Sequence, residues 1–252
     1  MRRTHMMTRL YLAAIVACAV LTAGACSSYS APTGPGPTVM DPAATPAPPS
    51  PPTAPQPPAT ARYRVVFDST WSAATHPTDF PATAHYSGLI GGTHGASVSF
   101  WVEGSIASEG IRQMAERGRK SPLDTEVQQA IAAGLAQHLL SGPELDTTPD
   151  SATMEFEVSQ SFPLVTLVSM IAPSPDWFVG VSALALFQNG QWRDEIRVDL
   201  AGFDAGTDSG VSYRSSDHET VPRAVISRLA GYPVESAGTA RPFGTFTFTR
   251  IQ

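Results

Sequence analysis

Apolar and polar residues alternate along much of the chain after residue 60, with the period of two that half-buried β-strands show. Residues 63–67 and 154–158 alternate clearly, so each of these segments has one apolar face and one polar face. The segment 164–172 is almost continuously apolar and stops at Pro173, as expected of a strand that is buried on both faces. Several short strands of this kind predict a mainly β fold, an antiparallel β-sandwich.

Turn residues divide the strands of the second half. Asn189-Gly190 is a strong signal for a type I′ hairpin, and it lies between strands predicted over 177–187 and 192–200. Near the C-terminus Phe246 and Phe248 alternate with threonines, which predicts a further strand.

One insertion has helical spacing. Ser121-Pro122-Leu123-Asp124 combines an N-cap residue, a proline in the first turn and a capping acid. Apolar residues then recur at helical spacing as far as Leu139, and Ser141-Gly142-Pro143 ends the pattern. A short helix is also expected over residues 109–117. We expect this pair of helices to cover a face or an edge of a sheet.

The N-terminus has the pattern of an export signal. Arg2, Arg3 and Arg9 precede an apolar stretch at 10–21, which is shorter than the roughly 20 residues of a membrane span. Ala23-Gly24-Ala25 then stand before Cys26, as in a bacterial lipobox, although Ala23 replaces the usual leucine. We therefore predict a signal peptide over 1–25 and a Cys26 that is acylated, for example with palmitate. The alternative is an ordinary signal peptide that is cut nearby.

Residues 26–60 are predicted to be a disordered tether. Twelve of the 23 prolines lie between Pro32 and Pro58, mixed with small and polar residues. Such a segment cannot bury enough apolar surface to fold, and at ~3.1 Å per residue in a polyproline II conformation it reaches on the order of 100 Å. The tether would hold a folded domain, predicted over 61–252, away from the membrane.

Charge and cysteine content narrow the classes of partner. The formal net charge is −6, and removing residues 1–25 leaves 13 basic and 22 acidic residues, a net charge of −9. An acidic chain argues against a nucleic-acid partner and against electrostatic docking on anionic lipid, so membrane attachment is expected through the acyl chains. Cys18 lies inside the signal, which leaves one cysteine and no intrachain disulfide in the exported form.

Two acidic turns carry the candidate chemistry, at 173–180 and 203–210. They place Asp176, Asp204 and Asp208 directly after apolar strand-like runs. If the fold brings these carboxylates together, a cation or a proton must relieve their repulsion, and carboxylate and carbonyl oxygens suit calcium. The turns therefore predict one calcium site at the rim of the sandwich. The alternative is that Asp and Gly are here only as ordinary turn residues.

The two acidic turns belong to a longer series of motifs that resembles the spondin domain, the N-terminal domain of F-spondin and mindin. The resemblance extends from about Tyr63 to Phe248 and includes, in order, Thr70-Trp71-Ser72, His85-Tyr86-Ser87, Ala107-Ser108-Glu109-Gly110, Leu167-Val168-Ser169, Pro173-Ser174-Pro175-Asp176-Trp177-Phe178-Val179-Gly180 and Asp204-Ala205-Gly206-Thr207-Asp208-Ser209-Gly210.

The resemblance implies an eight-stranded antiparallel sandwich of C2-like topology with calcium bound at one edge. By motif, the three aspartate ligands of the family correspond to Asp176, Asp204 and Asp208. A glutamate ligand corresponds by spacing to Glu157, which lies 19 residues before Asp176, and Glu155 on the same strand face is its competitor. Phe187 stands near where a family cysteine is expected. The family's roles in matrix adhesion, integrin binding or recognition of microbial patterns are therefore not transferred directly.

The favoured function is a non-catalytic, calcium-binding domain on a lipoprotein that is anchored at the outer face of the cell membrane or envelope. Its expected partner is an extracellular protein or glycan. One alternative is an aspartic hydrolase that uses Asp208-Ser209-Gly210, and another is a purely structural domain of the cell envelope. A zinc enzyme using His76, His85 and His94 is a weaker alternative, because a spacing of nine matches no compact ligand motif.

Overall fold

The computed structural model describes residues 34, 56–236 and 238–252. The predicted signal peptide, Cys26 and most of the predicted tether lie outside the described residues. None of the helices that are described is both long enough and apolar enough to cross a membrane.

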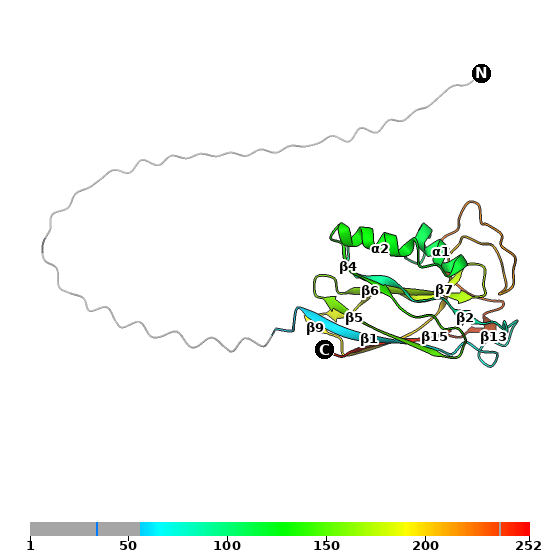
Figure 1. The fold of residues 1–252 in the computed structure, drawn as a ribbon, viewed down its shortest axis with the longest axis horizontal. Coiled ribbons are helices and arrows are strands. Elements are labelled where there is room, and N and C mark those ends of the chain that lie inside the picture. Colours follow the sequence, from blue (N-terminus) through cyan, green and yellow to red (C-terminus); the bar gives the residue numbers. More distant parts are fainter. Residues whose placement is uncertain (1–33, 35–55, 237) are drawn as a thin grey trace, which may run out of the picture. The chain divides into compact units, whose positions relative to one another are not determined.

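Two antiparallel sheets form the body of the fold (Figure 1). The smaller sheet has the order β10-β15-β1-β5, with β1 (Thr60–Ser69), β5 (Ser151–Ser159), β10 (Glu195–Asp199) and β15 (Gly244–Arg250). The larger sheet has the order β12-β11-β7-β6-β3-β4, and β2 pairs with β6 beside this path. Its strands are β2 (His85–Tyr86), β3 (Ile90–His94), β4 (Ala136–Ser141), β6 (Leu164–Ala172), β7 (Trp177–Ala185), β11 (Gly202–Asp204) and β12 (Ser227–Arg228).

Alternation in the sequence produces the core between the two sheets. In β1 the side chains of Tyr63, Val65 and Phe67 are buried, whereas the residues between them face outward or are only partly covered. Phe67 packs edge-on against Tyr86 at 4.8 Å between ring centroids and against Phe246 at 5.1 Å. Because these rings come from both sheets, they join the sheets through one apolar layer.

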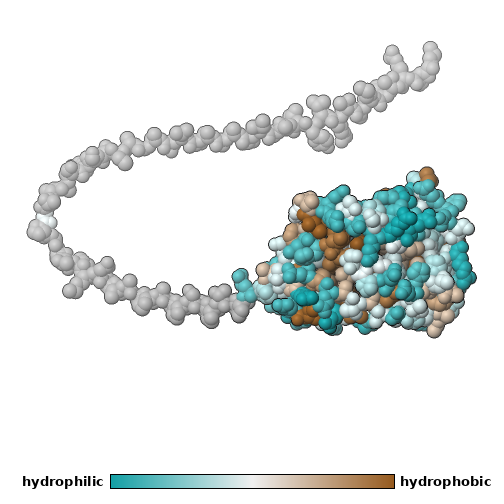
Figure 2. Space-filling model, in the orientation of Figure 1, coloured by the Kyte–Doolittle hydropathy of each residue, from teal (hydrophilic) through white to brown (hydrophobic). Residues whose placement is uncertain are grey.

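The two helices, α1 (Glu109–Arg117) and α2 (Leu123–Ala132), cover the outer face of the larger sheet (Figure 1). Ser108 caps α1, because its Oγ accepts the N–H of Ile111 at 3.1 Å. A second apolar cluster lies between the helices and the sheet. Both faces of β6 are therefore covered, and this explains its uninterrupted apolar sequence. The domain face seen in Figure 2 is mostly hydrophilic, with a smaller hydrophobic area on one side.

The structure confirms the antiparallel sandwich with a short helical insertion. It differs in strand number, because the main sheets contain four and seven strands within the described residues rather than eight in total. Two of these strands, β2 and β12, have only two residues each, and both belong to the larger sheet.

The predicted helix over 123–139 ends at Ala132. Gly134 adopts a left-handed conformation with φ 70°, and the following residues form β4, in which Leu139 and Leu140 pair with glycines of β3. The apolar spacing of this segment is compatible with a helix or a strand, and pairing with β3 decides between them. The predicted Asn189-Gly190 hairpin is confirmed, since β8 (Phe187–Gln188) and β9 (Gln191–Trp192) flank it. A second two-stranded hairpin joins β13 (Glu235–Ser236) to β14 (Thr239–Ala240).

Candidate metal centre

The first acidic turn connects β6 to β7. Pro173 ends β6, and the hydroxyl oxygen of Ser174 accepts the N–H of Trp177 at 3.0 Å, which closes the turn. Asp176 lies at its end and is completely buried. A buried carboxylate requires hydrogen-bond donors or a cation, since its desolvation is otherwise uncompensated.

The second acidic turn follows β11, which pairs with β7 so that Asp204 lies opposite Trp177. Asp204 Oδ1 accepts the N–H of Gly206 at 2.7 Å, and Asp208 Oδ1 accepts the N–H of Gly210 at 2.8 Å. Gly206 has φ 73°, and a Cβ there would lie 2.4 Å from the carbonyl oxygen of Ala224. Only glycine fits this position without a shift of the backbone.

The first turn inserts Asp176 into the second. Asp176 Oδ2 accepts the backbone N–H of Thr207 at 2.7 Å and that of Asp208 at 3.0 Å, and it lies 3.2 Å from the Thr207 hydroxyl. The Asp176 carbonyl oxygen also accepts the N–H of Ala205 at 3.1 Å. The structure therefore brings Asp176, Asp204 and Asp208 together at one edge of the larger sheet.

The electrostatics of this edge disfavour two adjacent negative charges. Burial, together with the nearby Asp204 carboxylate, raises the pKa of Asp176 to about 7, against the opposing effect of the Thr207 and Asp208 N–H groups. Burial also raises the pKa of Asp204, and the Asp208 carboxylate adds to the rise. The Gly206 N–H and the Trp177 indole lower it, although Trp177 Nε1 makes no hydrogen bond of normal geometry.

One buried oxygen has no donor. Asp176 Oδ1 is inaccessible to solvent and lacks a hydrogen-bond partner among the described residues, whereas Oδ2 has three donors. Carboxylate oxygens are ligands that calcium prefers, and a cation bound at Oδ1 would neutralise charge that is unfavourable in this buried position. Over the same part of the chain, no group of three or more His, Cys, Asp and Glu side chains is arranged so that it could hold a metal as it stands. The oxygens of Asp208 accept the N–H groups of Gly210 and His218, and Asp204 Oδ1 accepts the N–H of Gly206.

The structure separates Glu157 from the aspartates. Glu157 lies on the exposed face of β5 in the smaller sheet, opposite Arg62 near the start of β1. The other end of β1 leads to Trp71, and Tyr213 links Trp71 to Trp177 beside Asp176, with ring centroids 5.3 Å apart in both pairs. The seven residue-to-residue steps from Arg62 to Ser69 span about 23 Å in a strand. Glu157 therefore lies at the far end of the sandwich.

Glu155, the competitor of Glu157, lies on the same outer face of β5. Its carboxylate forms ion pairs with Arg62 at 3.0 Å and with Arg64 at 2.7 Å. These partners account for Glu155 without a metal ion.

The described residues do not show the geometry that an aspartic hydrolase or a zinc enzyme would need. The oxygens of Asp208 accept the backbone N–H groups of Gly210 and His218, and among the described residues the Asp208 carboxylate makes no hydrogen bond to a second carboxylate of the kind that an aspartic dyad has. The three histidines have separate environments. His76 packs on Phe243, His85 bonds the Thr83 carbonyl, and His94 bonds Thr166.

Sequence reasoning missed the donors that hold the aspartates. Thr207 supplies two of the three donors to Asp176 Oδ2. The segment around His218 folds back onto Asp208, where the His218 N–H donates to the Asp208 carboxylate and the backbones of Asp208 and Glu219 form an isolated β-bridge. Thr207 stands inside the recognised motif and was open to inference. No pattern in the sequence around His218 predicts that this segment packs against the turn that carries Asp208.

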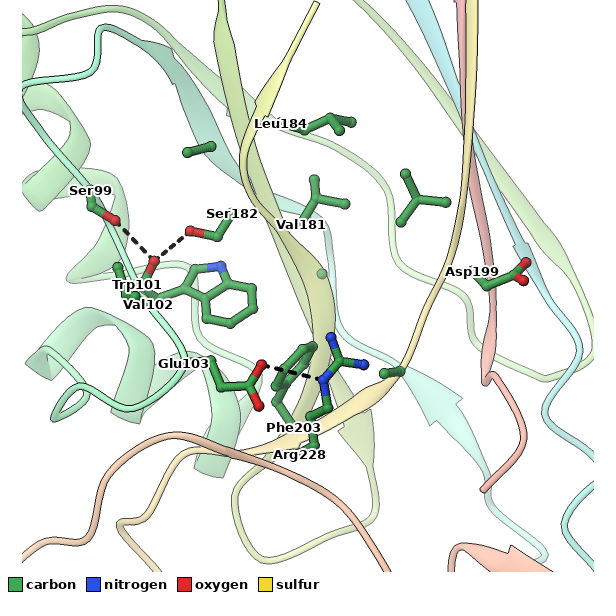
Figure 3. A pocket seen from close by; sticks show the side chains of 14 residues that line it. Ser99, Trp101, Val102, Glu103, Val181, Ser182, Leu184, Asp199, Phe203 and Arg228 are labelled. Atoms are coloured by element: carbon green, nitrogen blue, oxygen red, sulfur yellow. Dashed lines mark hydrogen bonds and ion pairs between the residues drawn. The ribbon is translucent and has the colours of Figure 1, made fainter. Parts of the chain in front are cut away.

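A cavity of about 510 Å³ lies elsewhere, beside β7, β10 and β11 (Figure 3). Trp101 and Phe203 form part of its wall, and the Arg228 guanidinium stands 5.3 Å from the centre of the Phe203 ring. An ion pair joins Arg228 Nε to Glu103 at 3.3 Å. The lining is largely apolar and has no nucleophile next to a base, so the cavity does not indicate catalysis.

Comparison with known proteins agrees with the series of motifs. The Spondin_N family model matches residues 61–243, which include all three aspartates. Human Spondin-2 is 33% identical over 198 residues, which are 77% of this chain and 58% of that protein. Mouse Spondin-1 is 38% identical over 178 residues, which are 68% of this chain and 22% of that protein. The chain thus spans little more than half of one relative and under a quarter of the other.

Proposed function

Because the chain belongs to the spondin N-terminal domain family, we propose that its sandwich is a non-catalytic recognition domain that binds calcium at the edge formed by Asp176, Asp204 and Asp208. Family membership supports the fold and the motif. The chemistry of this chain's own residues supports the metal.

The observation that carries the calcium proposal is the buried, unpartnered Oδ1 of Asp176 beside a second carboxylate with a raised pKa. Asp176 Oδ1 and the Asp204 carboxylate would face the ion, which would supply the positive charge that this edge lacks. Asp208 would join them by releasing the N–H of Gly210 or His218. Calcium accepts six to eight oxygens, so the remaining positions would be filled by backbone carbonyls, water or an oxygen of the ligand.

We further propose that the domain is displayed outside the cell on a lipid anchor at Cys26, with an extracellular protein or glycan as partner. The composition of residues 1–60 and the acidic balance of the chain support this proposal. The anchor would attach the protein to the membrane, and the aspartate edge would meet the partner.

The test is a calcium titration of the mature protein followed by thermal unfolding. Saturation to about 100 times Kd should stabilise the wild type by about 2.7 kcal/mol, and a chelator should reverse the effect. Asp176→Asn and Asp204→Asn should abolish the increment. Asp146→Asn is the matched control, because Asp146 is exposed and lies outside both turns. Identical melting curves with calcium and with chelator would rule out the proposed site.

The partner is to be sought with a glycan array and a protein pull-down, each run with calcium and with chelator. Binding that requires calcium and is lost in Asp204→Asn would place the partner at this edge. Binding that persists in chelator would show that recognition does not use the ion.

A further inference from the structure

The end of the proline-rich segment is held by the folded domain. Trp192 Nε1 donates to the carbonyl oxygen of Pro58 at 2.8 Å. Gln160 Nε2 reaches the same carbonyl at 2.9 Å and that of Pro57 at 3.2 Å, while the Gln160 backbone N–H donates to the carbonyl of Ala59 at 2.9 Å. Three consecutive carbonyls before β1 are thus bound by two residues.

The donors come from two turns that are brought together by the fold. Gln160 follows β5, and Trp192 follows the Asn189-Gly190 turn in β9. Trp192 is buried and packs edge-on against Phe187 at 4.8 Å, which fixes the direction of its indole N–H. The donor geometry is therefore set by the domain core.

Proline-rich chain is well suited to such donors. A polyproline II segment has no internal hydrogen bonds, so its carbonyls are free, and its restricted φ lowers the entropy that is lost on binding. Aromatic grooves recognise proline-rich peptides in this way. Pro57 is half-buried here and borders two cavities, one of about 420 Å³ with Phe187 and Gln160 and one of about 180 Å³ with Trp192 and Arg250.

We propose that Gln160, Phe187 and Trp192 form a proline clamp, whose occupant is the chain's own segment Gln56–Ala59. Covalent attachment gives this occupant a high effective concentration, so weak contacts suffice. The clamp fixes the point and direction in which the segment leaves the domain. This point lies at the start of β1, whereas the aspartate turns lie beyond the other end, about 33 Å away along ten strand residues.

The first test uses a post-proline endoprotease that accepts proteins, applied to the mature chain. Pro58–Ala59, Pro42–Ala43 and Pro46–Ala47 are the same dipeptide bond, so the last two serve as internal controls. Cleavage after Pro58 should be at least about tenfold slower than after Pro42 or Pro46. Trp192→Phe should accelerate it by roughly fivefold, the effect of one lost hydrogen bond, and Gln160→Glu, which loses both bonds from Nε2, by at least as much, with no change at the control bonds.

Gln188→Glu is the matched control variant, since Gln188 is exposed in β8 and lines neither of the two cavities that Pro57 borders. Equal acceleration by Gln160→Glu and Gln188→Glu would show an effect of charge and overturn the clamp. If the Pro58–Ala59 bond stays protected in the double variant Gln160→Glu/Trp192→Phe, the protection comes from the pairing of β1. This result would likewise overturn the clamp.

A reciprocal test leaves the domain residues unchanged. In Pro57→Gly/Pro58→Gly, hydrogen exchange of the Trp192 indole N–H, followed by NMR, should accelerate by at least fivefold relative to the wild type. Pro48→Gly/Pro49→Gly should leave it unchanged. Equal exchange in the two double variants would overturn the proposal, and because the sandwich itself is intact, the result would not reflect misfolding.

Discussion

Replacing Asp176 with asparagine should stabilise the calcium-free domain at neutral pH, although it removes a proposed ligand. Asparagine cannot ionise, and its amide oxygen can still accept the N–H groups of Thr207 and Asp208. Its amide nitrogen would take the place of Oδ1, which has no donor in the wild type, and the charge that the Asp204 carboxylate opposes would be gone. The substitution therefore removes charge repulsion and retains the turn.

The size of the effect follows from the pKa of Asp176, which rises from the usual 3.8 to about 7. At about 1.4 kcal/mol for each pH unit, ionising this group in the folded state costs about 4 kcal/mol more than in the unfolded chain. Because a neutral amide is a weaker acceptor than a carboxylate, we expect a net stabilisation of about 2 kcal/mol. In a domain of this size that raises Tm by about 4–8 °C.

The pH dependence has a definite sign. The folded state holds the Asp176 proton more strongly than the unfolded chain, so the contribution of Asp176 to the stability of the calcium-free wild type is full below about pH 4 and is lost as the pH rises through about 7. The difference between Asp176→Asn and wild type should therefore be close to zero at pH 4 and full at pH 7.5. The assay is urea unfolding in chelator across this range. An Asp176→Asn variant that is less stable than wild type at pH 7.5, or a difference that does not change with pH, would refute the reasoning.

Three further results are expected. Glu157→Gln should leave the calcium affinity unchanged in a titration, since Glu157 lies on the outer face of β5, and a tenfold loss would contradict this placement. Gly206→Ala should cost about 1–3 kcal/mol in chemical unfolding and weaken calcium binding, because a Cβ there meets the Ala224 carbonyl at positive φ, and neutral behaviour would count against the turn geometry. Phe67→Ala should cost about 3–5 kcal/mol by opening a cavity between the sheets, whereas Val211→Ala, at a side chain that is 70% exposed, should change stability by less than about 0.5 kcal/mol.

Features with a local physical cause were open to prediction from the sequence. The alternation in β1, the apolar run of β6 and the Asn189-Gly190 hairpin depend on neighbours within a few residues, and each appears in the structure as expected. The three aspartates also came together, because each stands in a long motif with its own turn residues.

Features that depend on distant partners were not determined by local pattern. Leu139 fits a helical stripe and a strand equally well, and its place in β4 is decided by pairing with Gly92. Glu157 was assigned by spacing alone, and the count of residues does not reveal that β5 belongs to the other sheet. The N–H of His218 reaches Asp208 from ten residues away through an irregular loop, which has no periodic signal.

The proposed clamp and the proposed metal site lie at opposite ends of the domain. A tether that leaves beside Trp192 starts near one end of β1, and the aspartate turns lie beyond the other end, so a partner bound there would approach from the side opposite to the attachment. A free joint at residue 60 would leave undefined the direction in which the chain leaves the domain. The hydrogen bonds to three consecutive carbonyls before β1 fix the direction of the chain over residues 57–59.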